Sequence, residues 1–245
     1  MKMIIFDLDG TLLNSEEQIP NSTIEYINKI KEQEVVIMAA TGRTLLETVE
    51  VESIKDICDY ILSSDGASLL DVKEDNFIYN REISKEGIEK LYSIVNHEHI
   101  DTIFYSLNGE KDKMDEDDRV NKVKLFFDDN DKINYYCKKI NDNYSNEYTA
   151  TAMKHSSREE YWLAINNSDT DKSTGLKYLK NKLSIDKKEI ISFGDRANDI
   201  PNFKESGIAV AMENAADEVK SASTHITRSN DELGVELVLR KIFDI

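Results

Sequence analysis

Short apolar runs alternate with helical segments through the first third of the chain. Met3–Phe6, Val35–Ala40 and Tyr60–Ser63 lack the strict polar alternation of a half-exposed strand. Such runs are typical of strands buried on both faces of a parallel sheet. Helical spacing predicts a helix from about Ser22 to Gln33 and another after Arg43. Strands that alternate with helices in this way indicate parallel strands joined by helical crossovers.

The last third of the chain repeats this pattern. The expected elements are a helix from Lys172 to about Leu183, strands at Ile190–Phe193 and Ile208–Ala211, and helices after Asp199 and after Asn230. Together the two outer thirds predict an α/β core domain with a Rossmann-like parallel sheet.

The middle of the chain has a different pattern. Apolar residues with helical spacing begin at Ile88, and a second helix is expected at Ile133–Tyr144. The runs that favour strands are Thr102–Leu107, Val123–Phe127, Tyr148–Met153 and Tyr161–Ile165. We therefore predict an α+β cap domain of residues 80–167, inserted into a core domain made of residues 1–79 and 168–245. Trp162 and the Tyr135-Tyr136 pair are expected in the cap core.

Composition narrows the classes of partner. The 245 residues carry a net charge of −17, which argues against nucleic acid or an anionic membrane surface. No apolar run approaches the roughly 20 residues of a membrane span, and the N-terminus lacks the apolar stretch of a secretory signal. Cys58 and Cys137 lie far apart without metal-ligand spacing. A cytoplasmic protein with two free thiols is the simplest interpretation.

Two carboxylates follow the first predicted strand, in Asp7-Leu8-Asp9-Gly10-Thr11. Ligands of open α/β sheets bind beyond the carboxyl ends of the strands, and acids this close together need a cation or a proton. Asp7 is a candidate nucleophile, which would form an aspartyl-phosphate. Asp9 is a candidate general acid/base. The alternative is an acidic turn that caps the next segment.

Two further segments are candidates for binding phosphate. Thr41 and Gly42 follow the second predicted strand, where the Thr41 hydroxyl and the N–H groups of Gly42 and Arg43 would open a helix and suit an anion. An ordinary N-cap at Thr41 explains the same residues equally well. Lys172 begins a predicted helix, where a cation opposes the helix dipole unless an anion is shared there. An exposed lysine is the alternative.

A third strand end carries more acids, in Gly194-Asp195-Arg196-Ala197-Asn198-Asp199. Asp195 and Asp199 are spaced so that both can face one crevice, although Asp and Asn are also common turn residues. Together with Asp7 and Asp9 they would place four carboxylates near one point. Each close pair costs about 4 kcal/mol at an effective dielectric near 20. Oxygen ligands beside a phosphate favour Mg²⁺ as the compensating cation.

The order of these motifs resembles the haloacid dehalogenase (HAD) superfamily. The motifs are Asp-x-Asp-Gly-Thr, Thr-Gly-Arg, a lysine and Gly-Asp-x-x-Asn-Asp. The length and position of the insert resemble the Cof-type subgroup, whose α/β cap is of the C2/IIB type. The segments 65–67 and 207–215 resemble that subgroup as well, so the likeness spans essentially the whole chain.

The resemblance implies a role for each motif residue. It makes Asp7 the nucleophile and Asp9 the acid/base. It implies Mg²⁺ held by the Asp7 carboxylate, the Asp9 carbonyl and Asp195, with Asp199 close by. The residues that would contact phosphate are Thr41, Gly42, Lys172 and Asn198.

This chain departs from the family pattern at three positions. Arg196 and Ser173 stand where the family usually has glycine, and Asp65 replaces a frequent asparagine. None of the three changes removes a catalytic group, so they bear on substrate preference more than on activity.

The resemblance implies a Mg²⁺-dependent phosphatase that acts on small phosphorylated metabolites, with sugar phosphates as the first expectation. A phosphomutase with the same chemistry and a non-catalytic sensor of a phosphorylated ligand are the alternatives. A monomer is expected because the cap already covers the site. Lys154, His155 and Arg158 could reach a substrate from the cap, although exposed surface is the simpler interpretation of these residues.

Overall fold

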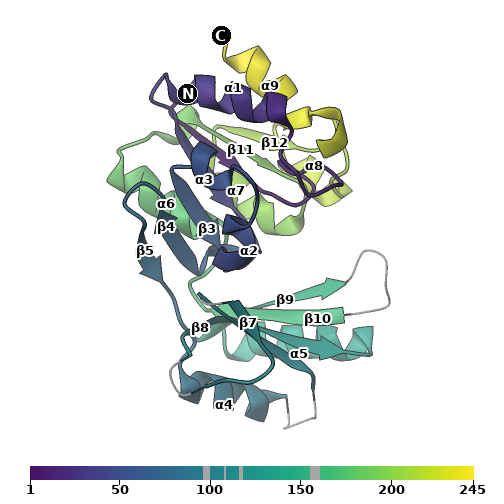
Figure 1. Ribbon diagram of the computed structural model, residues 1–245. Helices are drawn as coiled ribbons and strands as arrows, with labels where there is room; N and C mark the ends of the chain where they lie inside the picture. The colour runs from purple at the N-terminus through teal and green to yellow at the C-terminus, as the bar shows by residue number, and fades with distance from the viewer. Residues whose placement is uncertain (96–99, 108, 116–117, 155–160) are drawn as a thin grey trace.

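Two separate β-sheets organise the protein. The computed structural model describes residues 1–95, 100–107, 109–115, 118–154 and 161–245. Within these ranges the strands form one eight-stranded sheet and one five-stranded sheet. Figure 1 shows the two sheets in two lobes, with both chain ends on the side of the larger lobe that faces away from the smaller one.

The larger sheet contains the first and last parts of the chain, in the order β13-β12-β11-β1-β2-β3-β4-β5. Its strands are β1 (Met3–Phe6), β2 (Val36–Ala40), β3 (Tyr60–Ser63), β4 (Ser68–Asp71), β5 (Asn76–Asn80), β11 (Ile190–Gly194), β12 (Ile208–Ala211) and β13 (His225–Ile226). All neighbours from β13 to β3 pair in parallel, whereas β4 and β5 add an antiparallel edge. The predicted α/β core with a mostly parallel sheet is therefore confirmed, and the antiparallel edge is new.

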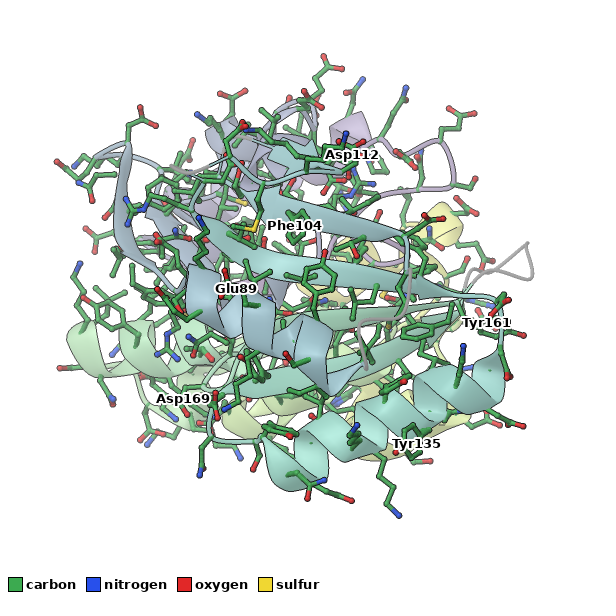
Figure 2. All side chains as sticks on the ribbon, turned by 90° about the horizontal axis from the view of Figure 1, so that it is seen from below. Glu89, Phe104, Asp112, Tyr135, Tyr161 and Asp169 are labelled. Atoms are coloured by element: carbon green, nitrogen blue, oxygen red, sulfur yellow. The ribbon has the colours of Figure 1, made fainter. Side chains whose placement is uncertain are left out.

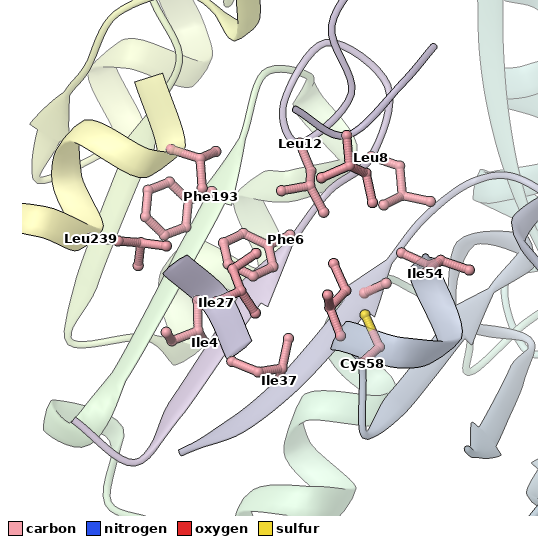
Figure 3. Packing of buried hydrophobic residues seen from close by; sticks show 14 of the residues in the cluster. Ile4, Phe6, Leu8, Leu12, Ile27, Ile37, Ile54, Cys58, Phe193 and Leu239 are labelled. Carbon is pink, nitrogen blue, oxygen red and sulfur yellow. The ribbon is translucent and has the colours of Figure 1, made fainter. Parts of the chain in front are cut away.

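Helices cover both faces of this sheet. The helices of the larger lobe are α1 (Asn21–Lys31), α2 (Leu45–Val49), α3 (Ile54–Ile57), α6 (Ser173–Lys182), α7 (Ile200–Glu205), α8 (Asp217–Ala222) and α9 (Gly234–Ile242). Alternate residues of β1 pack in different clusters: Ile4 and Phe6 pack with α1, α3 and α9 (Figure 3), and Met3 and Ile5 pack with α6. This is why β1 reads as a continuous apolar run.

The sheet order creates a crevice at β1. From β1 the chain crosses to β2 on one side, whereas β11 and β12 extend the sheet on the other side. The carboxyl ends of β1, β2 and β11 therefore meet at the point where the strand order reverses, which is where open α/β sheets bind ligands.

The smaller sheet is antiparallel and covered by helices on one face. It runs β7-β6-β8-β10-β9. Its strands are β6 (Thr102–Ser106), β7 (Gly109–Lys111), β8 (Val120–Phe127), β9 (Tyr148–Lys154) and β10 (Tyr161–Asn167), and its helices are α4 (Lys85–Ile94) and α5 (Asn130–Asn143). Figure 2, seen from this end, shows α4 and α5 in front of the sheet. Tyr136 is buried among them, whereas Tyr135 is 59% exposed and lies outside the predicted cap core.

The chain changes sheets between β5 and β6 and returns between β10 and β11. The exact domain boundaries proposed from the sequence stay a prediction. Among the described residues, no helix combines the length and the apolar character that a membrane crossing needs.

Gly66 lies in the turn between β3 and β4, and the structure predicts that it tolerates no side chain. Its φ is +104°, and a Cβ atom there would lie 2.0 Å from the backbone oxygen of Asp171. We expect Gly66→Ala to lower the free energy of unfolding by at least about 2 kcal/mol. Urea denaturation would measure the change.

Gly87→Ala in α4 is the matched control, because Gly87 has no left-handed φ and its nearest contact is a methyl group of Ile83. An equal loss of stability in the two variants would contradict the special requirement at Gly66.

Candidate active site

A buried lysine joins two of the predicted acidic residues. Lys172 immediately precedes α6 and is 2% exposed, so the exposed alternative is wrong. Its Nζ donates to Asp7 Oδ1 at 2.6 Å and to Asp199 Oδ1 at 2.8 Å. Burial opposes a charge on the ammonium, but the attraction of Asp199 and Asp7 outweighs it and raises the pKa of Lys172. The two buried carboxylates therefore favour the charged form of this lysine.

Three carboxylates converge around this cation. Oxygen atoms of Asp7, Asp195 and Asp199 all lie within 4.8 Å of one another. Burial and the neighbouring Asp199 raise the pKa of Asp7 and of Asp195, and Lys172 opposes the shift at both. The second Asp199 oxygen accepts the N–H groups of Asp195 and Arg196 at 3.0 and 3.1 Å, which fixes the loop after β11.

The carboxylate of Asp9 lies apart from this cluster, because Arg43 binds it. Arg43 Nε donates to both Asp9 oxygens, at 3.1 and 3.0 Å, and a second guanidinium nitrogen also contacts the carboxylate. The hydrogen bond to Asp9 raises the pKa of Arg43 although burial opposes it. Three of the four predicted carboxylates therefore lie together, whereas the fourth, that of Asp9, is held apart by Arg43.

Thr41 and Gly42 lie beside the site in a turn and not in a helix. The helix begins at Leu45 and its N-cap is Thr44, so the alternative of an N-cap at Thr41 is wrong. The fully buried Thr41 accepts the N–H of Arg43 on its hydroxyl oxygen at 3.1 Å. The Arg43 N–H is therefore engaged, which contradicts its expected availability for phosphate. Gly42 lines the cavity described below.

Asp65 connects the two lobes at this site. Its carboxylate accepts Asn198 Nδ2 at 3.0 Å and Nζ of Lys122 in β8 at 2.7 Å. Lys122 also donates to the Gly42 carbonyl at 2.9 Å. Burial would raise the pKa of Asp65, but the ammonium groups of Lys122 and Lys172 together with the hydrogen bonds lower it to about 2. The predicted phosphate contact Asn198 is thus held by Asp65.

A cavity of about 320 Å³ lies between the lobes, at the lower end of the range for small-molecule sites. The larger lobe contributes Asp7, Asp9, Gly42, Arg43, Glu47, Asp65, Thr170, Asp171, Lys172, Arg196, Asn198 and Pro201 to its walls. The smaller lobe contributes Lys122, Lys124, Thr149, Thr151, Met153, Trp162, Ala164 and Asn166. Trp162 therefore belongs to the cavity wall, and its assignment to the cap core is wrong.

Strand alternation could have revealed this wall. Val123 and Leu125 are buried in the cap core, whereas Lys122 and Lys124 alternate with them along β8 and face the cavity. The adjacent residues Trp162 and Leu163 of β10 likewise point to opposite faces of the sheet, with Leu163 in the cap core and Trp162 at the cavity. Of the other predicted cap contacts, His155 and Arg158 lie outside the described residues.

The donor set fits a hard divalent cation. The three clustered groups offer only oxygen, which Mg²⁺ prefers. Gly10 has a φ of +78°, and a Cβ there would lie 2.4 Å from Asp195 Oδ2, so the glycine lets the backbone after β1 approach this carboxylate. Asp7, Asp195 and Asp199 are thus the side chains that could hold such an ion.

The chain is similar to curated proteins along almost its whole length. It is 26% identical to the 5-amino-6-(5-phospho-D-ribitylamino)uracil phosphatase YcsE of Bacillus subtilis (strain 168), covering 98% of this chain and 95% of that protein. YwtE of the same organism, a phosphatase with the same named substrate, is also 26% identical and covers 96% of both chains.

The fold comparison agrees with these relatives. The crystal structure of TM0651 from Thermotoga maritima superimposes with a TM-score of 0.80 at 26% identity, covering 99% of this chain and 97% of that one. The sequence model of the family described as haloacid dehalogenase-like hydrolase matches residues 4–110 and 107–239 of this chain. The match confirms the superfamily predicted from the motif order: the chain belongs to the haloacid dehalogenase-like hydrolase family.

Proposed function

We propose that this protein is a Mg²⁺-dependent phosphatase that hydrolyses small phosphomonoesters through an aspartyl-phosphate on Asp7. The observation that carries the proposal is the buried Asp7 carboxylate, 2.6 Å from Lys172 Nζ and clustered with Asp195 and Asp199. It lies at the crevice of the larger sheet and lines the cavity between the lobes. The named activity of the relatives supports the same class of reaction.

In the first step an Asp7 oxygen attacks phosphorus and the ester P–O bond breaks, as covalent catalysis by a carboxylate requires. Lys172 stays charged throughout, and its ammonium offsets negative charge that develops on the phosphoryl oxygens. Asp199 orients that ammonium from its other side.

Asp9 is the proposed acid/base. It gives a proton to the leaving alkoxide in the first step and removes one from water in the second, when water attacks phosphorus and releases phosphate from Asp7. In the structure Arg43 binds the Asp9 carboxylate through a bifurcated hydrogen bond from Nε and a contact from a second guanidinium nitrogen.

Asp7 and Asp195, with Asp199 beside them, are the side chains proposed to hold Mg²⁺. When bound, Mg²⁺ offsets repulsion between these carboxylates and an incoming phosphate. Burial and the nearby Asp199 carboxylate raise the pKa of Asp7 and of Asp195.

We propose that the part of the substrate next to the scissile P–O bond is a sugar or a sugar alcohol. The two Bacillus relatives are named for a ribityl phosphate. Thr149, Thr151 and Asn166 line the cavity, and the Thr151 hydroxyl suits a substrate hydroxyl group. The Thr149 hydroxyl and the Asn166 amide nitrogen already donate to backbone carbonyls.

Asp7→Asn should reduce phosphate release by at least about a thousandfold, because an amide cannot form the acyl phosphate. Phosphate release from a panel of sugar phosphates with and without Mg²⁺ would measure this. Asp142→Asn, an exposed position in α5, is the matched control. Phosphate release by Asp7→Asn at the wild-type rate would contradict the role of Asp7 as the nucleophile. Formation of an isomerised sugar phosphate by the wild type, without free phosphate, would indicate a phosphomutase.

Asp9→Asn should lose about a hundredfold to ten-thousandfold in turnover, because it removes the acid/base. It should still bind Mg²⁺, since the Asp9 carboxylate faces Arg43 and not the three clustered acids. Calorimetric titration with Mg²⁺ would show affinity close to that of the wild type. A loss of metal affinity as large as that of Asp195→Asn would contradict this arrangement.

Lys172→Met should weaken inhibition by inorganic phosphate and lower the free energy of unfolding by about 3 to 5 kcal/mol, because it leaves buried carboxylates unpaired. Phosphate inhibition constants and urea denaturation would measure the two effects. Lys177→Met, exposed on the same helix, is the matched control. An unchanged inhibition constant would remove Lys172 from the phosphate site.

A further inference from the structure

The turn between β3 and β4 has an unusual backbone. Ser64, Asp65 and Gly66 have positive φ values of 50°, 54° and 104°. Residues with a Cβ atom rarely adopt this conformation, because it is sterically strained. Two backbone hydrogen bonds fix the turn on the segment after β2. The N–H of Ser64 donates to the Arg43 carbonyl at 2.7 Å, and the N–H of Asp65 donates to the Thr41 carbonyl at 3.1 Å. The strained turn therefore holds the Asp65 carboxylate at a defined place.

Asp65 lies beside residues that are expected to contact phosphate. Its Oδ1 accepts Asn198 Nδ2 at 3.0 Å, and a Cβ atom on Gly42 would lie 3.0 Å from the same oxygen. The pKa of Asp65 is lowered to about 2, so this carboxylate is charged at neutral pH. Without a counterion, a carboxylate at this place would repel a bound phosphate.

The smaller lobe supplies a counterion. Lys122 belongs to β8, and its side chain is 5% exposed. Its Nζ donates to Asp65 Oδ2 at 2.7 Å and to the Gly42 carbonyl at 2.9 Å. The ion pair therefore crosses from one lobe to the other at the edge of the proposed phosphate site.

Two buried amides join the same turn to the smaller lobe. Asn166 Nδ2 in β10 donates to the Ser64 carbonyl at 2.8 Å, and Asn121 Nδ2 in β8 donates to Ser68 Oγ at 2.9 Å. With Lys122 they form three polar contacts from the cap to residues 64–68. The turn therefore links the position of the cap to the surroundings of the phosphate site.

We propose that Lys122 is a positioning residue that acts through Asp65: its ammonium neutralises the Asp65 carboxylate and so makes the neighbouring site able to accept phosphate. Because Lys122 and Asp65 belong to different lobes, phosphate affinity then depends on contact between the cap and the turn. By linkage, bound phosphate strengthens that contact in return. This inference rests on the proposed phosphatase function and adds a requirement for phosphate binding that comes from the smaller lobe.

The test compares the phosphate affinity of the wild type, Lys122→Met, Asp65→Asn and the double variant. Calorimetric titration with inorganic phosphate in the presence of Mg²⁺ would measure the Kd without requiring turnover. Lys122→Met should raise the Kd at least about tenfold, because the uncompensated Asp65 charge repels the anion. Asp65→Asn should lower the Kd about threefold, because it removes that charge while the Asn oxygen can still accept Asn198 Nδ2.

The double variant carries the decisive result. Once Asp65 is Asn, the further change Lys122→Met should alter the Kd by less than about threefold, since the charge that needed a counterion is gone. A tenfold loss that persists in the Asp65→Asn background would make Lys122 a direct phosphate ligand and overturn its proposed role. Equal losses of affinity in the two single variants would reduce the ion pair to a structural contact and overturn the proposal as well.

Two further variants complete the experiment. Lys122→Gln can still donate to the Gly42 carbonyl and removes only the charge, so it should show the same loss of affinity as Lys122→Met. Lys138→Met, exposed on α5, makes the same change of net charge in the cap and should keep the wild-type Kd. A wild-type Kd in Lys122→Gln would contradict the role of the charge.

Failure of the proposed function has a different signature. If the folded wild type with Mg²⁺ neither binds phosphate nor hydrolyses p-nitrophenyl phosphate, both proposals are overturned. If it binds phosphate without any turnover, the phosphatase proposal fails, and the four Kd values still decide the role of Lys122. Turnover together with an unchanged Kd in Lys122→Met would leave the phosphatase intact and reject only the role of Lys122.

Discussion

The arrangement of the site depends on a buried cation, the ammonium of Lys172 between Asp7 and Asp199. Three carboxylates this close would repel one another strongly in a buried setting, and the lysine removes part of that cost. The neighbouring backbone is shaped to allow the contact. Gly194 leaves room for the Asp199 side chain, since a Cβ there would lie 2.4 Å from that of Asp199. Gly66 leaves room for the backbone of Asp171, directly before the lysine.

The carboxylates that line the cavity all come from the larger lobe, which also contributes basic residues, whereas the charged lining residues of the smaller lobe are lysines. Strand ends of the larger sheet supply acids and the loops that orient them, whereas the polar face of the cap sheet supplies lysines, hydroxyl groups and an indole ring. The ion pair of Asp65 with Lys122 joins the walls beside Gly42 and Asn198. Basic and acidic side chains are balanced among the residues that line the cavity, whereas the protein as a whole carries a net charge of −17.

Sequence patterns predicted much of this arrangement but missed pairings that depend on distant residues. The buried strands β1, β2 and β3 were identified from apolar runs, and the structure places Asp7, Lys172, Asp195 and Asp199 together as the motifs implied. The antiparallel edge formed by β4 and β5 was not predicted, because short strands with polar residues resemble loops. The prediction that Trp162 packs in the cap core was wrong, because its strand register turns it toward the cavity.

The sequence by itself determined the class of fold, the family and the identity of the acidic motifs, because these depend on local periodicity and on the order of short motifs. Only the tertiary structure decided which acids share one cation and which is held by Arg43, since those contacts join residues far apart in the chain. It also decided that Lys124 and Trp162 line one wall of the cavity. Their side chains share a face only once β8 and β10 pair in a defined register, and a shift of one residue would turn them to the other face.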